Sequence, residues 1–170
     1  MVFETDRLIL REMSHADLQA LKAILQNPNV MYAYGHSFTD HDVQTWLARQ
    51  KGRYAEYGFG LWAVILKTSG KMIGQCGLTM QPYKNVRVLE IGYLLNENFW
   101  HCGYASEAAL GCKEYAFEKL RREKVYSIIK ADNISSIKVA ERIGMEKEAE
   151  FVTRYYGGDM LHYLYSVSRH

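Results

Sequence analysis

The sequence predicts an α/β (α+β) fold in which a mixed, mostly antiparallel sheet of about seven strands is flanked by about four helices. Apolar, β-rich runs alternate with helical segments in the order strand, two helices, three strands, helix, strand, helix and two strands. The chain has 170 residues, of which 48% are hydrophobic, which is enough for one sizeable core. No internal repeat or linker divides it, so we expect a single domain over residues 1–170.

The first part of the chain predicts one short strand and two helices. The apolar run at 8–10 indicates an opening strand. Ser14 is suited to cap a helix whose apolar residues recur at helical spacing until Pro28. Thr39 is suited to begin a second helix, which Gly58 would end.

The middle of the chain predicts three strands and then a helix. The runs at 61–66, 72–80 and 86–95 are apolar and rich in residues that favour strands. The pair Ser69-Gly70 separates the first two runs, which predicts a hairpin. Small and apolar residues then fall on one helical stripe between Ala105 and Leu120, so we expect a helix there.

The last part predicts a strand, a helix and two closing strands. The first strand is expected at 125–129, and Asn133 is suited to cap the helix that follows. The closing strands are expected at 151–155 and 161–167, on either side of a turn at Gly157-Gly158.

Composition and charge exclude several classes of function. The chain has 21 basic and 19 acidic side chains, mixed along the sequence, so there is no basic tract for nucleic acid or a membrane surface. The sequence shows no signal peptide and no apolar run long enough to cross a bilayer, so we expect a cytoplasmic protein. Cys76, Cys102 and Cys112 lack the spacing of a disulfide framework or a zinc site. We therefore expect reduced thiols and no metal.

One segment combines a strand, a tight turn and the start of a helix. The strand ends at Leu95, and the turn and helix start lie between Trp100 and Ala108. Gly103 and Ala105 let a ligand approach the backbone, and the first N–H groups of a helix point outward at the positive end of its dipole. The pattern therefore favours an anion such as a pyrophosphate. The alternative interpretation is a plain strand-to-helix turn that uses Gly103 only for its backbone angles.

Several motifs resemble those of the GNAT superfamily of N-acetyltransferases. That family has the motif Gln/Arg-x-x-Gly-x-Gly/Ala after a strand, and the matching residues here are Trp100, Gly103 and Ala105. Trp100 in place of Gln or Arg resembles the branch that contains the RimJ and RimL ribosomal-protein acetyltransferases. The opening at 5–11 and the block at 133–145 are similar to the same branch. Several motifs in the correct order are more specific than any one of them.

The resemblance implies a binding site for acetyl-coenzyme A as co-substrate. The family holds the pyrophosphate with backbone N–H groups, which implies a role for His101, Cys102, Gly103, Tyr104, Ala105 and Ser106. In the family two strands splay apart beside this site, so the backbone of Tyr93, Leu94 and Leu95 is expected to pair with the pantetheine arm. Asn133 is implied as a further pantetheine contact.

Glu90 is the candidate general base. Its sequence neighbours are apolar, and strand alternation places it on one face with Gly92 and Leu94, beside the expected thioester. Partial burial would raise its pKa toward neutrality, which suits a base that acts through water. A matching glutamate is frequent in the family, and a solvated strand glutamate is the alternative.

A proton donor to the departing thiolate is also needed. The resemblance implies Ser136 for this role, because a serine at the matching position has been assigned it in related enzymes. Many GNAT enzymes use a tyrosine later in this helix, but the aligned residue here is Ala140, so that general acid is missing.

Other residues carry weaker signals. Tyr32 and Tyr34 lie in a segment that forms one wall of the acceptor pocket in similar enzymes, and ordinary packing is the alternative. Cys102 lies beside His101 at the helix start, but nothing assures the geometry of a nucleophile and base, so direct transfer is favoured. The pair Tyr155-Tyr156 is expected to pack in the core.

Together these features predict an N-acetyltransferase that moves an acetyl group from acetyl-coenzyme A to a primary amine, with a protein or peptide N-terminal amine as the expected acceptor. At pH 7 such an amine costs about 1.1 kcal/mol to deprotonate, against about 4.6 kcal/mol for a lysine-type amine, so a modest base suffices. One alternative acceptor is a small amine, such as an amino sugar, a polyamine or an aminoglycoside. The alternative from another class is a non-catalytic sensor or interaction module that binds coenzyme A. We expect a monomer or homodimer.

Overall fold

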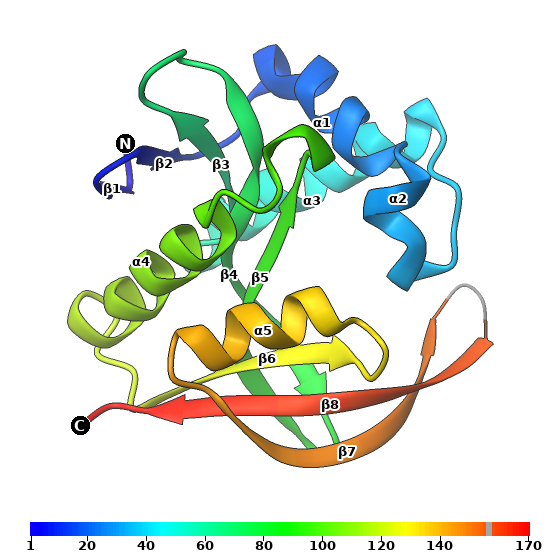
Figure 1. Cartoon of the computed structure of the whole chain (residues 1–170), viewed down its shortest axis with the longest axis vertical. Coiled ribbons are helices and arrows are strands. Elements are labelled where there is room, and N and C mark those ends of the chain that lie inside the picture. Colours follow the sequence, from blue (N-terminus) through cyan, green and yellow to red (C-terminus); the bar gives the residue numbers. More distant parts are fainter. Residues whose placement is uncertain (156–157) are drawn as a thin grey trace.

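The computed structural model describes residues 1–155 and 158–170 (Figure 1). Within these residues eight strands form one sheet in the order β1-β2-β3-β4-β5-β6-β8-β7. Neighbouring strands are antiparallel except for β5 and β6, which are parallel. The predicted mixed, mostly antiparallel sheet is therefore confirmed. No helix in the described ranges is long and apolar enough to span a bilayer.

The elements lie close to their predicted ranges. The strands are β1 (Phe3–Glu4), β2 (Leu8–Arg11), β3 (Leu61–Leu66), β4 (Met72–Tyr83), β5 (Val86–Leu95), β6 (Lys124–Lys130), β7 (Glu146–Tyr155) and β8 (Gly158–Ser168). The α-helices are α1 (Leu18–Leu25), α2 (Pro28–Met31), α3 (Asp40–Tyr57), α4 (Tyr104–Glu118) and α5 (Ile134–Arg142).

Two short elements were absent from the prediction. Strand β1 has two residues and helix α2 has four, so neither is long enough to show a period in the sequence. The predicted turn at Gly157-Gly158 involves Gly157, which lies outside the described residues, as does Tyr156. Only the backbone of Tyr155 is described, so the predicted packing of this tyrosine pair is not tested.

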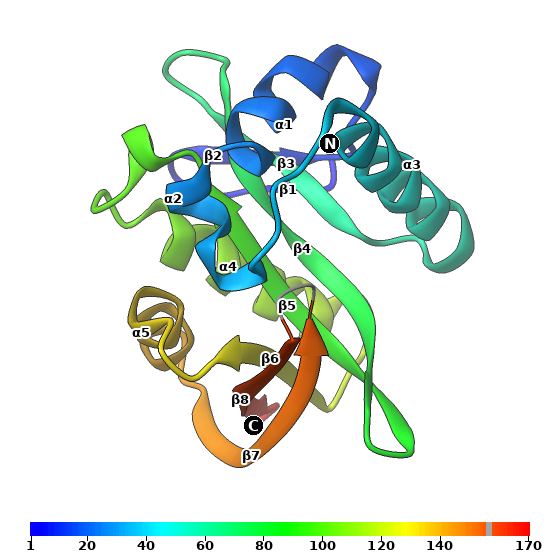
Figure 2. The same ribbon diagram turned by 90° about the vertical axis from the view of Figure 1, so that its right-hand side faces the viewer.

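Helices cover both faces of the sheet, with α4 and α5 on one side and α1, α2 and α3 on the other (Figure 2). Strand β3 is buried on both faces and alternates between the two cores. Trp62 and Val64 belong to the core beneath α4 and α5, whereas Ala63 and Ile65 belong to the core beneath α1 and α3. This arrangement explains why β3 is apolar along its whole length.

Side-chain caps fix the starts of the helices. Thr39 Oγ1 accepts a hydrogen bond from Asp42 N at 3.1 Å at the start of α3. Asn133 Oδ1 accepts one from Ser136 N at 3.3 Å at the start of α5, as predicted. Ser14 does not cap α1 as predicted, because a 3-10 turn over His15–Asp17 follows Ser14 and Asp17 is the residue that precedes α1.

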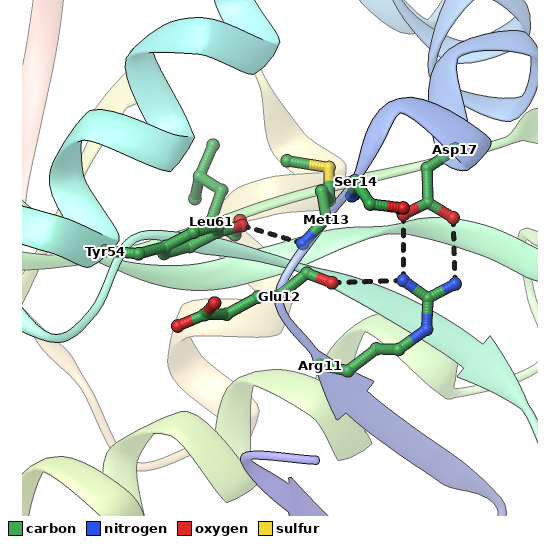
Figure 3. A network of polar contacts seen from close by, with 7 residues as sticks. All are labelled: Arg11, Glu12, Met13, Ser14, Asp17, Tyr54 and Leu61. Carbon is green, nitrogen blue, oxygen red and sulfur yellow. Dashed lines mark hydrogen bonds and ion pairs between the residues drawn. The ribbon is translucent and has the colours of Figure 1, made fainter.

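A polar network ties α3 to the N-terminal strand (Figure 3). The Arg11 guanidinium binds both oxygens of the buried Asp17 carboxylate at 2.8 Å, and Ser14 N donates to the same carboxylate at 2.8 Å. Beside this pair, the Tyr54 hydroxyl donates to the carbonyl of Leu61 and accepts from Met13 N. Burial raises the pKa of Tyr54 to about 12, so the hydroxyl keeps its proton at physiological pH.

Gln50 provides the second anchor of α3. Its side chain is buried, and its Oε1 accepts a hydrogen bond from Leu61 N at 3.0 Å. Tyr54 and Gln50 therefore bind the two polar backbone groups of Leu61, one turn of helix apart. These two contacts hold this part of α3 at a fixed distance from the sheet.

We expect Tyr54→Phe to lower the free energy of unfolding by about 1 to 3 kcal/mol, because it leaves the buried N–H of Met13 and the carbonyl of Leu61 without a partner. Urea denaturation monitored by circular dichroism measures the loss. Tyr57→Phe is the matched control, since that hydroxyl accepts only from Arg87 near the surface, at 3.1 Å. Equal stability losses in the two variants would contradict the anchoring role of Tyr54.

Candidate active site

The candidate site forms where β5 and β6 separate. Within the described residues, the one register pairing between these strands joins Glu90 to Tyr126. The Ser127 hydroxyl then donates to the carbonyl of Ile91 at 2.9 Å, and beyond it β6 follows β8 while β5 follows β4. The end of β5 is consequently an open edge, which is the predicted splay of the sheet.

The backbone of β5 alternates between this open edge and β4. The carbonyls of Ile91 and Leu95 face the open side, where Leu95 O accepts a hydrogen bond from Trp100 Nε1 at 3.0 Å. Alternation directs the backbone of Tyr93 to the same side and that of Leu94 toward β4. Tyr93 therefore keeps its backbone groups for an added extended ligand, whereas the Leu95 carbonyl is already bonded to Trp100. The backbone of Leu94, which was also predicted to pair with the ligand, is directed toward β4, although Leu94 lines both cavities.

An anion-binding cradle follows directly in the chain. Gly103 caps α4 in the left-handed region with a φ of 81°, and His101 has a φ of 61°. Within the described residues, no backbone N–H from 101 to 106 donates to a protein acceptor. The Ser106 hydroxyl is buried and also lacks a partner there. Unpaired donors at a helix N-terminus are suited to an anion such as a pyrophosphate.

Arg7 and Glu107 fasten this cradle to the start of the chain. Arg7 Nε donates to Glu107 Oε2 at 2.6 Å, and Arg7 Nη1 donates to the carbonyl of Cys102 at 2.9 Å. The Thr5 hydroxyl donates to Glu107 Oε1 at 2.6 Å, and the Arg7 guanidinium lies 4.4 Å from the ring centre of Tyr104. The opening motif and the helix motif thus form one contact, which the sequence did not reveal.

Glu90 lies at the point of divergence and is half-buried. Ile128 N donates to Oε2 at 3.0 Å, which fixes one carboxylate oxygen. Burial raises the pKa of Glu90 to about 7, against the lowering effects of the Ile128 N–H and the nearby Arg53 guanidinium. A carboxyl with this pKa suits proton transfer near neutral pH.

Gly92 keeps space open beside this carboxylate. It lies two residues after Glu90 on the same face of β5. A Cβ atom at Gly92 would lie 3.4 Å from the Leu61 side chain and 3.8 Å from Glu90 Oε1. Any side chain longer than alanine would therefore grow into the space in front of Glu90.

Two adjoining cavities meet at Glu90. The larger, of about 540 Å³, extends toward α3, and the smaller, of about 110 Å³, extends toward α5. The volume of the larger cavity lies in the range of small-molecule sites. The residues that line both are Tyr34, Glu90, Gly92, Tyr93, Leu94 and Ile128.

The predicted residues of the α5 side come together in the smaller cavity. Asn133 and Ser136 line it with Glu90. The Tyr93 hydroxyl donates to the carbonyl of Ser136 at 2.6 Å, and burial raises its pKa well above the usual range. The sequence did not reveal this link between β5 and α5, nor the buried His162 that lines the same cavity.

The remaining predicted residues are more scattered. Tyr34 lines both cavities and packs edge-on against Trp46. Tyr32 has 49% of its side chain exposed and is not among the residues lining either cavity. The Cys102 thiol is exposed and donates to the carbonyl of Trp100, not to His101.

The sequence analysis also missed the polar wall of the larger cavity. Arg49, Gln50 and Arg53 of α3 line this cavity, as does Arg154 of β7. The spacing of Arg49 and Arg53 places them on the same side of α3, one turn apart. This spacing is visible in the sequence and could have predicted a positively charged helix face. Arg154 is distant in sequence, so only the fold brings it to the same cavity.

We expect Gly103→Ala to weaken coenzyme A binding by about five- to thirtyfold, because a non-glycine residue in the left-handed region costs about 1 to 2 kcal/mol. The added Cβ would lie 3.4 Å from Arg7 Nη2, so strain outweighs any clash. Isothermal titration calorimetry measures the dissociation constant. Gly58→Ala is the matched control, because Gly58 has a φ of 78° at the end of α3 and open space around it. A similar loss of affinity in both variants would argue against the cradle.

Comparisons with known proteins agree with this geometry. Residues 7–146 match the family model described as an acetyltransferase (GNAT) domain. The uncharacterized protein YkkB of Bacillus subtilis is 37% identical over 142 residues, which are 83% of each chain. The uncharacterized N-acetyltransferase YnaD of the same organism is 33% identical over 152 residues, covering 89% of this chain and 86% of its own.

Solved structures share the fold. A ribosomal-protein-S5-alanine acetyltransferase from Vibrio fischeri has a TM-score of 0.78 at 18% identity, covering 98% of this chain and 95% of that one. A spermidine N-acetyltransferase from Vibrio cholerae, in complex with coenzyme A and spermine, has a TM-score of 0.78 at 17% identity, covering 96% of both chains. Because the family model spans most of the chain, this protein belongs to the GNAT family and is an N-acetyltransferase that uses acetyl-coenzyme A.

Proposed function

We propose that this enzyme acetylates a primary amine by direct attack, with Glu90 as a general base that acts through water. The single observation that carries the proposal is the Glu90 carboxyl, whose pKa is about 7, at the junction of the two cavities. The larger cavity would take the acceptor. The smaller one would take the end of the pantetheine arm, beside Asn133 and the open edge at Tyr93 and Leu95.

The protein's own groups have separate tasks in this scheme. Acetyl-coenzyme A supplies the acetyl group as an activated thioester. The N–H groups from 101 to 106 and the Ser106 hydroxyl hold its pyrophosphate. The Ile128 N–H fixes Glu90 Oε2. Oε1 accepts a long hydrogen bond from the Thr79 hydroxyl at 3.5 Å and lies near the space beside Gly92, where it can take the ammonium proton of the acceptor through water.

Ser136 is our proposed proton donor to the leaving thiolate. Its side chain lies in the smaller cavity, and its hydroxyl has no hydrogen-bond partner within the described residues. The Tyr93 hydroxyl is already donated to the Ser136 carbonyl. Ala140, which replaces the tyrosine of many related enzymes, is buried and offers no proton.

A protein or peptide N-terminal amine is the acceptor that we propose first. A base with a pKa of about 7 is well matched to an amine with a pKa of about 7.8, and poorly matched to a lysine side chain. A small amine is the second candidate, favoured by a cavity volume of about 540 Å³. Structural neighbours act on each class, a ribosomal protein and spermidine.

We also propose that the enzyme works in the cytoplasm as a monomer or homodimer. Its three cysteines are free thiols, which fits a reducing compartment. A sensor that binds coenzyme A without catalysis is the opposing hypothesis. Release of free thiol from acetyl-coenzyme A in the presence of peptides, amino sugars, polyamines or aminoglycosides would exclude the sensor.

We expect Glu90→Gln to lower kcat by about 10²- to 10⁴-fold while the KM for acetyl-coenzyme A changes little, because only proton transfer is lost. In the parent enzyme kcat/KM should rise with pH and level off above about pH 7, and this limb should vanish in the variant. Glu148→Gln, on the surface of β7 beside Lys124, is the control. A second acceptor whose amine has a different pKa distinguishes the ionisation of Glu90 from that of the amine. Only the part of the pH profile that is due to the amine should shift between the two acceptors. An unchanged rate after Glu90→Gln would exclude Glu90 as the base.

Glu90 should also make stability depend on pH. Its pKa is about 7 in the folded protein and 4.5 in its ordinary state, so between these values the folded protein binds more protons than the unfolded chain. The free energy of unfolding should then fall as pH rises through this window, by up to about 3 kcal/mol. Urea denaturation at pH 5 and pH 8 should show that Glu90→Gln gains stability relative to the parent at the higher pH. A difference that does not vary with pH would contradict the raised pKa.

A further inference from the structure

In the part of the chain that the structure describes, three arginines line the larger cavity and have no carboxylate partner. Arg49 and Arg53 come from α3, and Arg154 comes from β7. Within the described ranges, none of the three forms an ion pair. The Arg53 Nη1 atom donates to Gln50 Oε1 at 3.2 Å, which is a neutral acceptor.

Two arginines outside the larger cavity have carboxylate partners. Arg7 pairs with Glu107 at 2.6 Å, and Arg11 pairs with Asp17 at 2.8 Å. Arg53 in the larger cavity has no such ion pair among the described residues, and burial and the neighbouring Arg49 charge both lower its pKa. Like charges one helical turn apart also destabilise a helix. The cavity therefore concentrates positive charge at a cost to the fold.

The position of Arg53 is fixed by the packing of α3. Gln50 Oε1 binds both Arg53 and Leu61 N, so the guanidinium is held by a buried side chain that is itself bonded to β3. The planar guanidinium donates two parallel hydrogen bonds to a carboxylate or phosphate. A half-buried arginine oriented in this way is suited to hold such an anion.

Side chains of both charges line the larger cavity. Among the described residues that line the larger cavity, Glu90 of β5 is the one acidic side chain. Arg53 is near enough to lower the pKa of Glu90, but the two do not pair. An amine at Glu90 would therefore have an anionic binding site within the same cavity.

We propose that the acceptor amine carries a carboxylate or phosphate group close to its nitrogen, and that Arg49, Arg53 and Arg154 bind this anion. The inference rests on the proposed function and names the class of its acceptor. A peptide would supply the anion from an acidic side chain in its first residues, and a small amine would supply it directly. A polyamine would bring further positive charge to the arginines and is a poor acceptor.

Matched pairs of acceptors that differ only in charge test this inference. One pair is a peptide with Glu at its second position and the same peptide with Gln there. The other pair is glucosamine 6-phosphate and glucosamine, with spermidine as a cationic probe. At least one anionic acceptor should have a kcat/KM roughly tenfold or more above its neutral partner, mainly through a lower KM. The pair with the larger ratio identifies the source of the anion.

Substitutions then locate the anion site. Arg53→Gln should reduce the preference for the anionic acceptor toward unity, and Arg53→Lys should keep part of it. Arg87→Gln is the control, because Arg87 lies outside the cavity lining and donates to the Tyr57 hydroxyl and the Met80 carbonyl. A preference that survives Arg53→Gln, or that falls equally in Arg87→Gln, would overturn the inference.

A binding measurement separates this inference from the proposed function. Calorimetric titration of the same acceptors into the enzyme saturated with coenzyme A requires no acetyl transfer. Tighter binding of the anionic members without turnover would support the anion site and reject the proposed catalysis. Efficient acetylation of spermidine, or equal turnover and equal binding of charged and neutral members, would support catalysis and reject the anion site.

Discussion

The divergence of β5 from β6 is the constraint on which the active site depends. Within residues 1–155 and 158–170, Glu90 is the one residue of β5 that pairs with β6, and past Ile91 no described strand neighbours this edge of β5. Unpaired backbone groups inside a protein are costly, so an edge of this kind persists where a ligand can satisfy it. The same divergence places the Glu90 carboxyl at the junction of two cavities and leads the chain into the donor-rich start of α4.

Contacts between distant segments hold the two sides of this opening. At the proposed coenzyme site, Arg7 and Thr5 bind Glu107 and so lock the turn before α4 to the N-terminal strand. At the proposed acceptor site, Tyr54 and Gln50 bind the backbone of Leu61 and fix α3 against β3. Gln50 and Leu61 also line the larger cavity, so this second anchor forms part of the cavity wall.

The electrostatics of the site follow from this packing. Burial raises the pKa of the Glu90 carboxyl to about 7, and the Ile128 N–H keeps this pKa from rising further. The arginines of α3 and β7 that line the larger cavity have no carboxylate partners among the described residues. Glu90 is the one acidic residue among the described residues that line the same cavity. A transferase that must recognise one amine among many gains selectivity from such a separation of charge.

The sequence by itself determined the elements that depend on local spacing. Strand alternation placed Glu90 on one face with Gly92, the Gly103-x-Ala105 turn predicted the anion cradle, and Asn133 predicted the cap of α5. Only the tertiary structure decided which distant side chains come together, such as Thr5 and Glu107 in a hydrogen bond or Arg53 and Arg154 in the lining of one cavity. The physical reason is that hydrogen bonding within a strand or helix leaves a period in the sequence, whereas packing between elements depends on their relative placement and leaves none.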